Sequence, residues 1–408
     1  MTTTKTFALL LTAIVGVAFA QECGPGKNVA SNAAIAADVS SDNKAKDAPP
    51  IRLDLSKDDQ YLVYYDSWDL NKIELVKNKF KIIILHPGND ATMVSAEQVQ
   101  KLKNGNATKV FGYLTIGEDD TCSGDEVKSK DKKLKCAKQK LPYNDKLGPV
   151  TLKSGAREFE KNGYPSYLVD LNGDKEPDIN ESWNSFYIDA ENENWRKIVF
   201  ERAGKVANLG IDGLFLDTLD TSQNFTESQP GMLHLIRDLK NATFDGRQMI
   251  LIANRGLFFF KKNHCEICNS VSAVMFENLF TSQCVSKKDD KNCKEDSSGI
   301  EASFLNNGNG EALNDLKEVQ VEYPQLQVLV LEYVGRQQKK PPCKDLLKGT
   351  LEKLTKGITV AASHFEYDGR YPYYVAPSQL NVPAGGKSED YFPVFSASGR
   401  LDYANWCR

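Results

Sequence analysis

Short apolar runs recur along the chain from residue 51 onward, separated by stretches with helical spacing. Near-continuous apolar runs are typical of parallel strands that are buried on both faces. Eight strands alternating with helices over about 310 residues favour a closed α/β fold, the (β/α)8 TIM-like barrel. The predicted strands are 62–66, 81–86, 110–117, 211–217, 249–254, 273–277, 326–332 and 358–364.

An open doubly wound sheet is the alternative arrangement. Such a sheet usually carries a Gly-rich phosphate-binding turn after its first strand, whereas residues 65–68 read Tyr-Asp-Ser-Trp. Apolar residues with helical spacing at 195–207 and 346–354 fit the crossover helices of a barrel. The long insertion at 119–194 is rich in Trp, Tyr and Asp in its second half, so we expect it to help wall the pocket.

The amino-terminal residues predict export. Lys5 precedes an apolar run that closes in an Ala-x-Ala site at Ala20, so residues 1–20 are typical of a secretory signal peptide. The run is too short to span a membrane comfortably, and no other stretch of about 18 apolar residues occurs. Residues 21–50 are polar and predict a flexible leader, and residues 51–408 predict the barrel with a C-terminal aromatic extension. We expect a secreted, extracellular monomer without membrane binding.

Charge and cysteine content narrow the class of protein further. With 51 basic against 55 acidic residues, the chain offers no basic field for nucleic acid. Nine cysteines in an exported chain predict disulfide-bridged loop insertions, with Cys122–Cys136 and Cys284–Cys293 as candidate pairs. Residues 264–268 could form half of a zinc site or a redox pair, but no second cluster has the matching spacing, so structural disulfides are favoured and no metal is expected. Four N-glycosylation tripeptides fit an extracellular surface, and they begin at Asn106, Asn180, Asn224 and Asn241.

Two of the predicted strands end in acidic residues suited to catalysis. Asp217 ends the strand 211–217, and Glu277 ends the strand 273–277. The carboxyl ends of barrel strands meet at one rim, where barrel enzymes keep their active sites. Glycoside hydrolysis needs one carboxyl to protonate the leaving oxygen and another to attack the sugar or activate water. We therefore predict Asp217 and Glu277 as the catalytic residues, with Asp220 as a substitute for Asp217 and a turn or cap role as the alternative.

Other side chains at the same rim are candidates for binding the sugar. Asn254 follows a buried run and can hydrogen-bond hydroxyl groups or orient the acids, while the alternative is a turn residue before Gly256. A glycan cleft needs flat aromatic side chains, although each of them can equally be ordinary packing. The predicted substrate-binding residues are Asp66, Tyr65, Trp68, Tyr113, Glu118, Trp183, Asp220, Asn254, Glu332 and Tyr367.

Residues 170–181 carry oxygen-bearing side chains at the spacing of a calcium loop. However, Lys175 stands where glycine is usual, and Pro177 disfavours the helix that normally follows such a loop. We therefore expect a solvent-exposed turn rather than a calcium site.

Five motifs follow one another between residues 60 and 368, namely 111–118, 177–184, 195–196, 211–220 and 276–280. In this order and spacing the chain resembles the endo-α-1,4-polygalactosaminidase family of glycoside hydrolases and related bacterial extracellular barrel proteins. The resemblance implies a (β/α)8 barrel, hydrolysis of α-1,4-linked galactosamine polymers without metal or cofactor, and an acidic pair that maps onto Asp217 and Glu277. The Cys-rich insertions, the Lys-rich segment after Thr121 and the aromatic tail after Glu366 depart from the family pattern.

The acid count at the predicted rim agrees with such a substrate. Deacetylated galactosamine units are cationic near neutral pH, so a negative rim would attract them. Two alternatives are a secreted glycan-binding or cell-wall barrel without catalysis, and a barrel hydrolase for another polysaccharide. A lipase or peptidase is disfavoured because neither a Gly-x-Ser-x-Gly nor a His-Glu-x-x-His motif occurs. We predict a cationic galactosamine-containing polysaccharide as the substrate.

Overall fold

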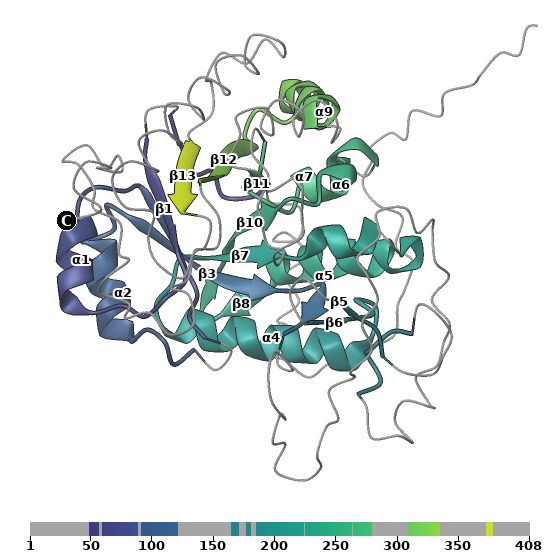
Figure 1. The fold of residues 1–408 in the computed structure, drawn as a ribbon, viewed down its shortest axis with the longest axis horizontal. Helices are drawn as coiled ribbons and strands as arrows, with labels where there is room; N and C mark the ends of the chain where they lie inside the picture. The colour runs from purple at the N-terminus through teal and green to yellow at the C-terminus, as the bar shows by residue number, and fades with distance from the viewer. Residues whose placement is uncertain are drawn as a thin grey trace, which may run out of the picture. The chain divides into compact units, whose positions relative to one another are not determined.

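A computed structural model of the protein is shown as a ribbon in Figure 1. The residues it describes belong to one compact unit. They are 49–56, 59–88, 91–120, 165–170, 177–180, 185–223, 225–262, 264–279, 309–334 and 373–377.

Eight parallel strands form the central sheet, in the order β1-β2-β3-β7-β10-β11-β12-β13. Every neighbouring pair is parallel, as expected when helical crossovers join successive strands. Cα atoms of β1 and β13 approach within 8 Å, so the sheet curls until its first and last strands come together. The strands are β1 Tyr61–Tyr64, β2 Ile82–Leu85, β3 Lys109–Thr115, β7 Gly213–Asp217, β10 Ile250–Asn254, β11 Ala273–Glu277, β12 Gln327–Val334 and β13 Tyr373–Pro377.

Seven of these strands confirm the predicted runs, with boundaries that differ by a few residues. Their apolar side chains are buried, and Leu62, Ile84 and Ile252 have no exposed surface. The predicted eighth strand, 358–364, lies outside the described residues. The strand that pairs with β12 is β13, which is further along the chain.

Helices follow most of the strands, and α2 and α4 pack against β3 (Figure 1). The predicted helix at 195–207 is confirmed as α4, and Trp195, Val199 and Ala203 form its buried stripe. The predicted helical stretch at 346–354 lies outside the described residues. The helices are α1 Leu70–Val76, α2 Ala96–Lys103, α4 Glu193–Asn208, η1 Leu219–Gln223, η2 Thr226–Ser228, α5 Gln229–Asn241, α6 Leu257–Lys262, α7 His264–Cys268 and α9 Asn309–Glu322.

A small antiparallel sheet occupies part of the long insertion between β3 and β7, in the order β4-β6-β5. Its strands are β4 (Glu118–Asp119), β5 (Ile179–Asn180) and β6 (Ser185–Tyr187), and a separate two-stranded hairpin comprises β8 (Thr243–Phe244) and β9 (Arg247–Gln248). The expectation of a solvent-exposed turn at 170–181 is wrong for its described flanks. Asp170 and Asp178 are buried there because the Asp178 N–H donates to the Val169 carbonyl within this packed layer. Residues 171–176 are not among those described.

Two features of the export prediction can be compared with the structure. Cys268 is a buried free thiol, and both candidate disulfide pairs lie outside the described residues. Asn180 is buried and donates a hydrogen bond to Glu118, so this tripeptide does not present the exposed acceptor we predicted. Across the described part of the chain, no helix is long and apolar enough to cross a membrane, and no group of three or more His, Cys, Asp or Glu residues could hold a metal ion.

The close spacing of β7 and its neighbours depends on Gly213. A Cβ atom at this position would lie 2.3 Å from the Ile250 carbonyl oxygen and 2.4 Å from a Phe111 ring carbon. Any side chain would therefore push β3 or β10 away from β7. This packing sets the spacing of the strand that ends in Asp217.

Candidate active site

The predicted catalytic residues lie at one edge of the sheet, with a single strand between them. Asp217 ends β7, Asn254 ends β10 and Glu277 ends β11, and these three strands are adjacent. The Asn254 amide nitrogen donates to Asp217 Oδ1 at 2.7 Å and to Glu277 Oε2 at 2.8 Å. Because one nitrogen contacts both oxygens, these two oxygens lie no more than about 5.5 Å apart, a separation compatible with retaining glycosidases.

Each of these three strands is followed by a residue in the left-handed backbone region. Thr218 has φ 64°, Arg255 has φ 55° and Asn278 has φ 59°. Asparagine tolerates this conformation, whereas it is an outlier for a β-branched threonine. Such strain persists where the surrounding structure over-determines it, which is common at active sites. The chain therefore turns sharply after every residue of the Asp217–Asn254–Glu277 group.

Arg255 connects the ends of two of these strands and forms an ion pair with Asp220. Its Nη1 donates to the Glu277 carbonyl at 3.0 Å, and its Nε lies 3.3 Å from Asp220 Oδ2. Asp220 sits in η1 and forms this ion pair, while Asp217 is the acid beside Glu277. The acidic pair therefore consists of Asp217 and Glu277, and Asp220 does not take the place of Asp217.

Aromatic side chains from β1, β2 and β3 lie beside the acids. Tyr65 packs edge-on to Tyr113 at a centroid distance of 5.1 Å, and His86 stacks on Tyr113 at 4.8 Å. The Tyr113 hydroxyl also lies close to Asp217. Burial, reinforced by the negative charge of Asp217, raises the pKa of both tyrosines well above its usual value, so both keep their hydroxyl protons.

His86 is neutral in this cluster. Burial lowers the pKa of His86 to about 4, although Asp217 opposes the shift. Its Nδ1 accepts a hydrogen bond from the Gly88 N–H at 2.9 Å, which requires that nitrogen to be unprotonated. The imidazole therefore carries its proton on Nε2 and adds no positive charge beside Asp217.

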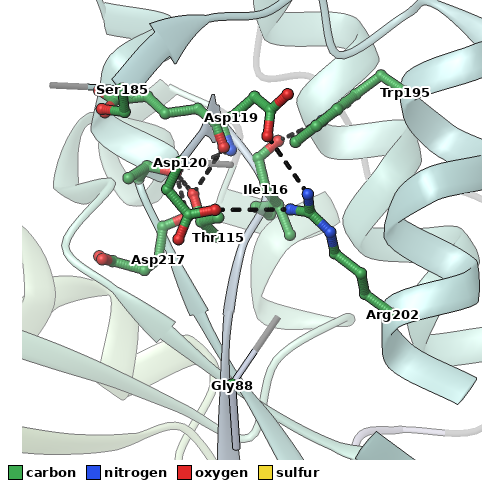
Figure 2. A network of polar contacts seen from close by, with 12 residues as sticks. Gly88, Thr115, Ile116, Asp119, Asp120, Ser185, Trp195, Arg202 and Asp217 are labelled. Atoms are coloured by element: carbon green, nitrogen blue, oxygen red, sulfur yellow. Dashed lines mark hydrogen bonds and ion pairs between the residues drawn. The ribbon is translucent and has the colours of Figure 1, made fainter. Parts of the chain in front are cut away.

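A further acid, Asp120, was absent from our sequence-based prediction. Figure 2 shows its carboxylate beside Asp217, and a dashed line joins it to Arg202 of α4 on the other side. Arg202 Nη1 lies 3.8 Å from Asp120, and Nη2 lies 3.3 Å from Asp119, so one guanidinium serves two carboxylates. Burial raises the pKa of Asp120, with Arg202 opposing and Asp119 and Asp217 adding to the rise. The only signals in the sequence were the acidic pair after Glu118 and an arginine seven residues after Trp195.

Two predicted binding residues belong to the interior instead. Trp68 is 5% exposed and packs edge-on against Tyr64 at 5.2 Å, so it is a core residue rather than a sugar platform. Glu118 is 3% exposed because Asn180, Ser185 and Thr221 surround its carboxylate and donate to it. Neither side chain lies exposed at the rim as predicted.

The remaining predicted residues are less constrained. Asp66 follows β1, is partly exposed and accepts a hydrogen bond from the Ser67 N–H at 2.6 Å. Glu332 lies in β12, but the structure describes only its backbone. Trp183 and Tyr367 lie outside the described residues. Their roles in binding stay predictions.

The chemistry available at this edge is that of paired carboxylates. Two acids that share an amide donor lie close enough to act on opposite sides of one sugar carbon. Tyr65, His86 and Tyr113 provide flat surfaces with polar tips, which suits a ring with hydroxyl groups. The group has the parts that a glycosidase requires.

Comparisons with known proteins give one family match and several similar solved structures. The sequence profile of glycoside hydrolase family GH114 matches residues 67–375. No curated protein gives a significant match. Similar solved structures include the glycoside hydrolase domain of PelA from Pseudomonas aeruginosa, with 16% identity over 81% of this chain and 98% of that chain and a TM-score of 0.46.

Two further solved structures are also similar to this chain. Aspergillus fumigatus Ega3, solved in complex with galactosamine, has 11% identity over 80% of this chain and 94% of that chain, with a TM-score of 0.47. An α-amylase from H. orenii has 10% identity over 85% of this chain and 72% of that chain, with a TM-score of 0.42. On the profile match, which spans most of its length, this chain belongs to glycoside hydrolase family GH114 and is a glycosidase.

Proposed function

We propose that the protein is a secreted retaining glycosidase that cleaves α-1,4-linked galactosamine-containing polysaccharide within a closed (β/α)8 barrel. The observation that carries the proposal is the Asn254 amide that donates to both Asp217 and Glu277. A retaining mechanism needs one carboxylate close enough to attack the anomeric carbon, and two oxygens no more than about 5.5 Å apart support direct attack. Export is supported by the signal-like residues 1–20.

The hydrogen bonds around the acids favour one assignment of roles. Asp217 accepts a hydrogen bond from Asn254 and lies beside the Tyr113 hydroxyl, and these two neighbours orient its carboxylate. We therefore assign Asp217 as the nucleophile that forms the glycosyl-enzyme bond. Glu277 protonates the departing glycosidic oxygen and then takes a proton from the water that hydrolyses the intermediate.

The charge balance of the pocket supports a cationic substrate. Asp120, Asp217 and Glu277 gather at one edge, and the nearby His86 is neutral. Arg202 is shared between Asp119 and Asp120, so it does not neutralise the group. Excess negative charge attracts the ammonium groups of deacetylated galactosamine and gives no such attraction for a neutral glycan.

The experiment measures reducing-end release from polygalactosamine and from a neutral α-glucan. The wild type should release ends only from the galactosamine polymer, while Asp217→Asn and Glu277→Gln should not. Azide should restore turnover to Glu277→Ala on a substrate with an activated leaving group, because that variant still forms the intermediate. Product NMR should show retained anomeric configuration. Inverted product, or release from α-glucan alone, would contradict the proposal.

A further inference from the structure

Glu118 is a buried acid near the candidate site whose two carboxylate oxygens both accept hydrogen bonds. Its Oε1 accepts from Thr221 Oγ1 at 2.8 Å and from Asn180 Nδ2 at 3.1 Å, and its Oε2 accepts from Ser185 Oγ. At 3% exposure the carboxylate cannot reach a polysaccharide. Its role therefore has to act through its neighbours.

The three donors come from separate parts of the fold. Asn180 belongs to β5 and Ser185 to β6, whereas Thr221 belongs to η1, the turn that follows the end of β7. Glu118 itself lies in β4. One carboxylate thus connects the small antiparallel sheet to the segment immediately after Asp217.

A second set of contacts joins the same two segments through their backbones. The Gly117 N–H donates to Thr218 Oγ1 at 2.8 Å, and the Ile116 N–H donates to the Asp217 carbonyl at 3.1 Å. A Cβ on Gly117 would lie 2.0 Å from the Thr218 carbonyl oxygen, so this approach requires glycine. The Thr221 N–H in turn donates to that carbonyl at 3.3 Å.

Thr218 is the residue that these contacts hold in place. It directly follows Asp217 and has a φ of 64°, an unfavourable backbone for a threonine. Without contacts on both sides the backbone would relax, and the Asp217 side chain would turn away from Asn254 and Glu277. The Glu118–Thr221 hydrogen bond closes one side of this clamp, and Gly117 closes the other.

We infer that Glu118 is a positioning residue for Asp217, acting through Thr221 and the left-handed Thr218. The inference rests on the proposed role of Asp217 as nucleophile. Glu118 acts through its acceptor oxygens, since Oε1 accepts from Thr221 and Asn180 and Oε2 accepts from Ser185. A carboxylic acid or a carboxamide can accept from Thr221 equally well.

The decisive variant is Thr221→Val, which removes the hydroxyl and keeps the shape of the side chain. It should lower kcat on the galactosamine polymer by about 10-fold with KM within about 2-fold, since a misaligned nucleophile affects chemistry more than binding. Ser185→Ala is the matched control, because it removes another donor to Glu118 and leaves the η1 contact intact. Its kcat should stay within about 2-fold of the wild type. Equal losses in both variants, or a wild-type kcat in Thr221→Val, would overturn the inference.

Two further variants separate positioning from folding. Glu118→Gln keeps an acceptor for Thr221 and should retain kcat, whereas Glu118→Ala should lose it. Adding Thr218→Asn to Thr221→Val should restore part of kcat, because asparagine tolerates the left-handed backbone. No recovery together with an inactive Glu118→Gln would contradict a positioning role.

If the wild type releases no ends from the polymer, the proposed function fails separately. Amide hydrogen exchange at 217–221 still tests the clamp. Faster exchange in Thr221→Val than in Ser185→Ala supports it, and identical exchange overturns it.

Discussion

Strand β7 has an aspartate at each end, and the protein surrounds the two in opposite ways. Asp212, just before the strand, lies 3.0 Å from Lys103 and 3.7 Å from Lys109 and accepts from the Val110 N–H. Asp217, at the other end, meets an asparagine amide and a tyrosine hydroxyl, and no lysine or arginine pairs with it among the described residues. The amino edge of the sheet neutralises its acid for stability, whereas the carboxyl edge keeps its acid available for reaction.

The largest contrast is expected when each aspartate is replaced by asparagine. Asp217→Asn should lower kcat on the order of 10³-fold or more, because the nucleophile is lost. Asp212→Asn should leave kcat of the folded protein nearly unchanged but lower the free energy of unfolding by about 3 kcal/mol, since Lys103 stays buried without its counter-charge. Reducing-end assays and denaturant unfolding of both variants test this. A comparable loss of activity in both would break the comparison.

Asn254 sharpens the comparison because it holds the two acids of the carboxyl edge together. Asn254→Ala should lower kcat by about 10²-fold, since both carboxylates lose the donor that fixes their separation. The exposed Asn208→Ala on α4 serves as the control and should behave as the wild type. A kcat in Asn254→Ala close to the wild-type value would mean that other contacts align the pair.

The carboxyl edge also costs stability, and pH reveals the cost. Because burial raises the pKa of Glu118 from 4.5 to about 7, the folded protein binds this proton more tightly than the unfolded chain does. The resulting stabilisation is fully present below pH 4.5 and is lost as pH rises through about 7. Glu118→Gln should remove about 3 kcal/mol of this pH dependence in urea unfolding measured from pH 4 to pH 8. If the unfolding free energy of Glu118→Gln depends on pH as that of the wild type does, a group other than Glu118 causes the dependence.

The smallest effect is expected at Asp120, whose charge we propose helps to attract a cationic substrate. Asp120→Asn should lower kcat/KM about 10-fold on partly deacetylated polymer and little on fully N-acetylated polymer, with a weaker dependence on salt. Glu74→Gln, an exposed acid on α1 paired with Lys77, is the control for net charge. Equal losses of kcat/KM on both polymers would mean that Asp120 supports the structure and does not attract the substrate.

Much of the carboxyl edge could be predicted from the sequence, because apolar runs locate strands and their last residues share one edge. Asp217, Asn254 and Glu277 each end such a run, and their meeting follows from strand order alone. The strand β13 was not among the predicted strands, because Tyr373–Pro377 is short and ends in proline. Its pairing with β12 identifies it as a strand, and sequence pattern does not report pairing.

Side-chain burial near the edge was harder to predict. Glu118 and Trp68 lie within a few residues of strand ends, as exposed site residues do, yet neighbours distant in sequence cover them. Asn180 and Ser185, which enclose Glu118, lie more than 60 residues away along the chain. Asp120 was missed for the same reason, because its partner Arg202 comes from α4. Such contacts arise from tertiary packing and leave no local period.

The three left-handed residues set a limit for anyone who would redesign this enzyme for another glycan. Loops that follow β7, β10 and β11 are natural places for exchange, because they surround the acids without forming the sheet. Thr218, Arg255 and Asn278 nevertheless belong to the scaffold, since their backbones aim the residues before them. A grafted loop should therefore begin beyond each of these positions, so that the inherited turn is carried over with the strand.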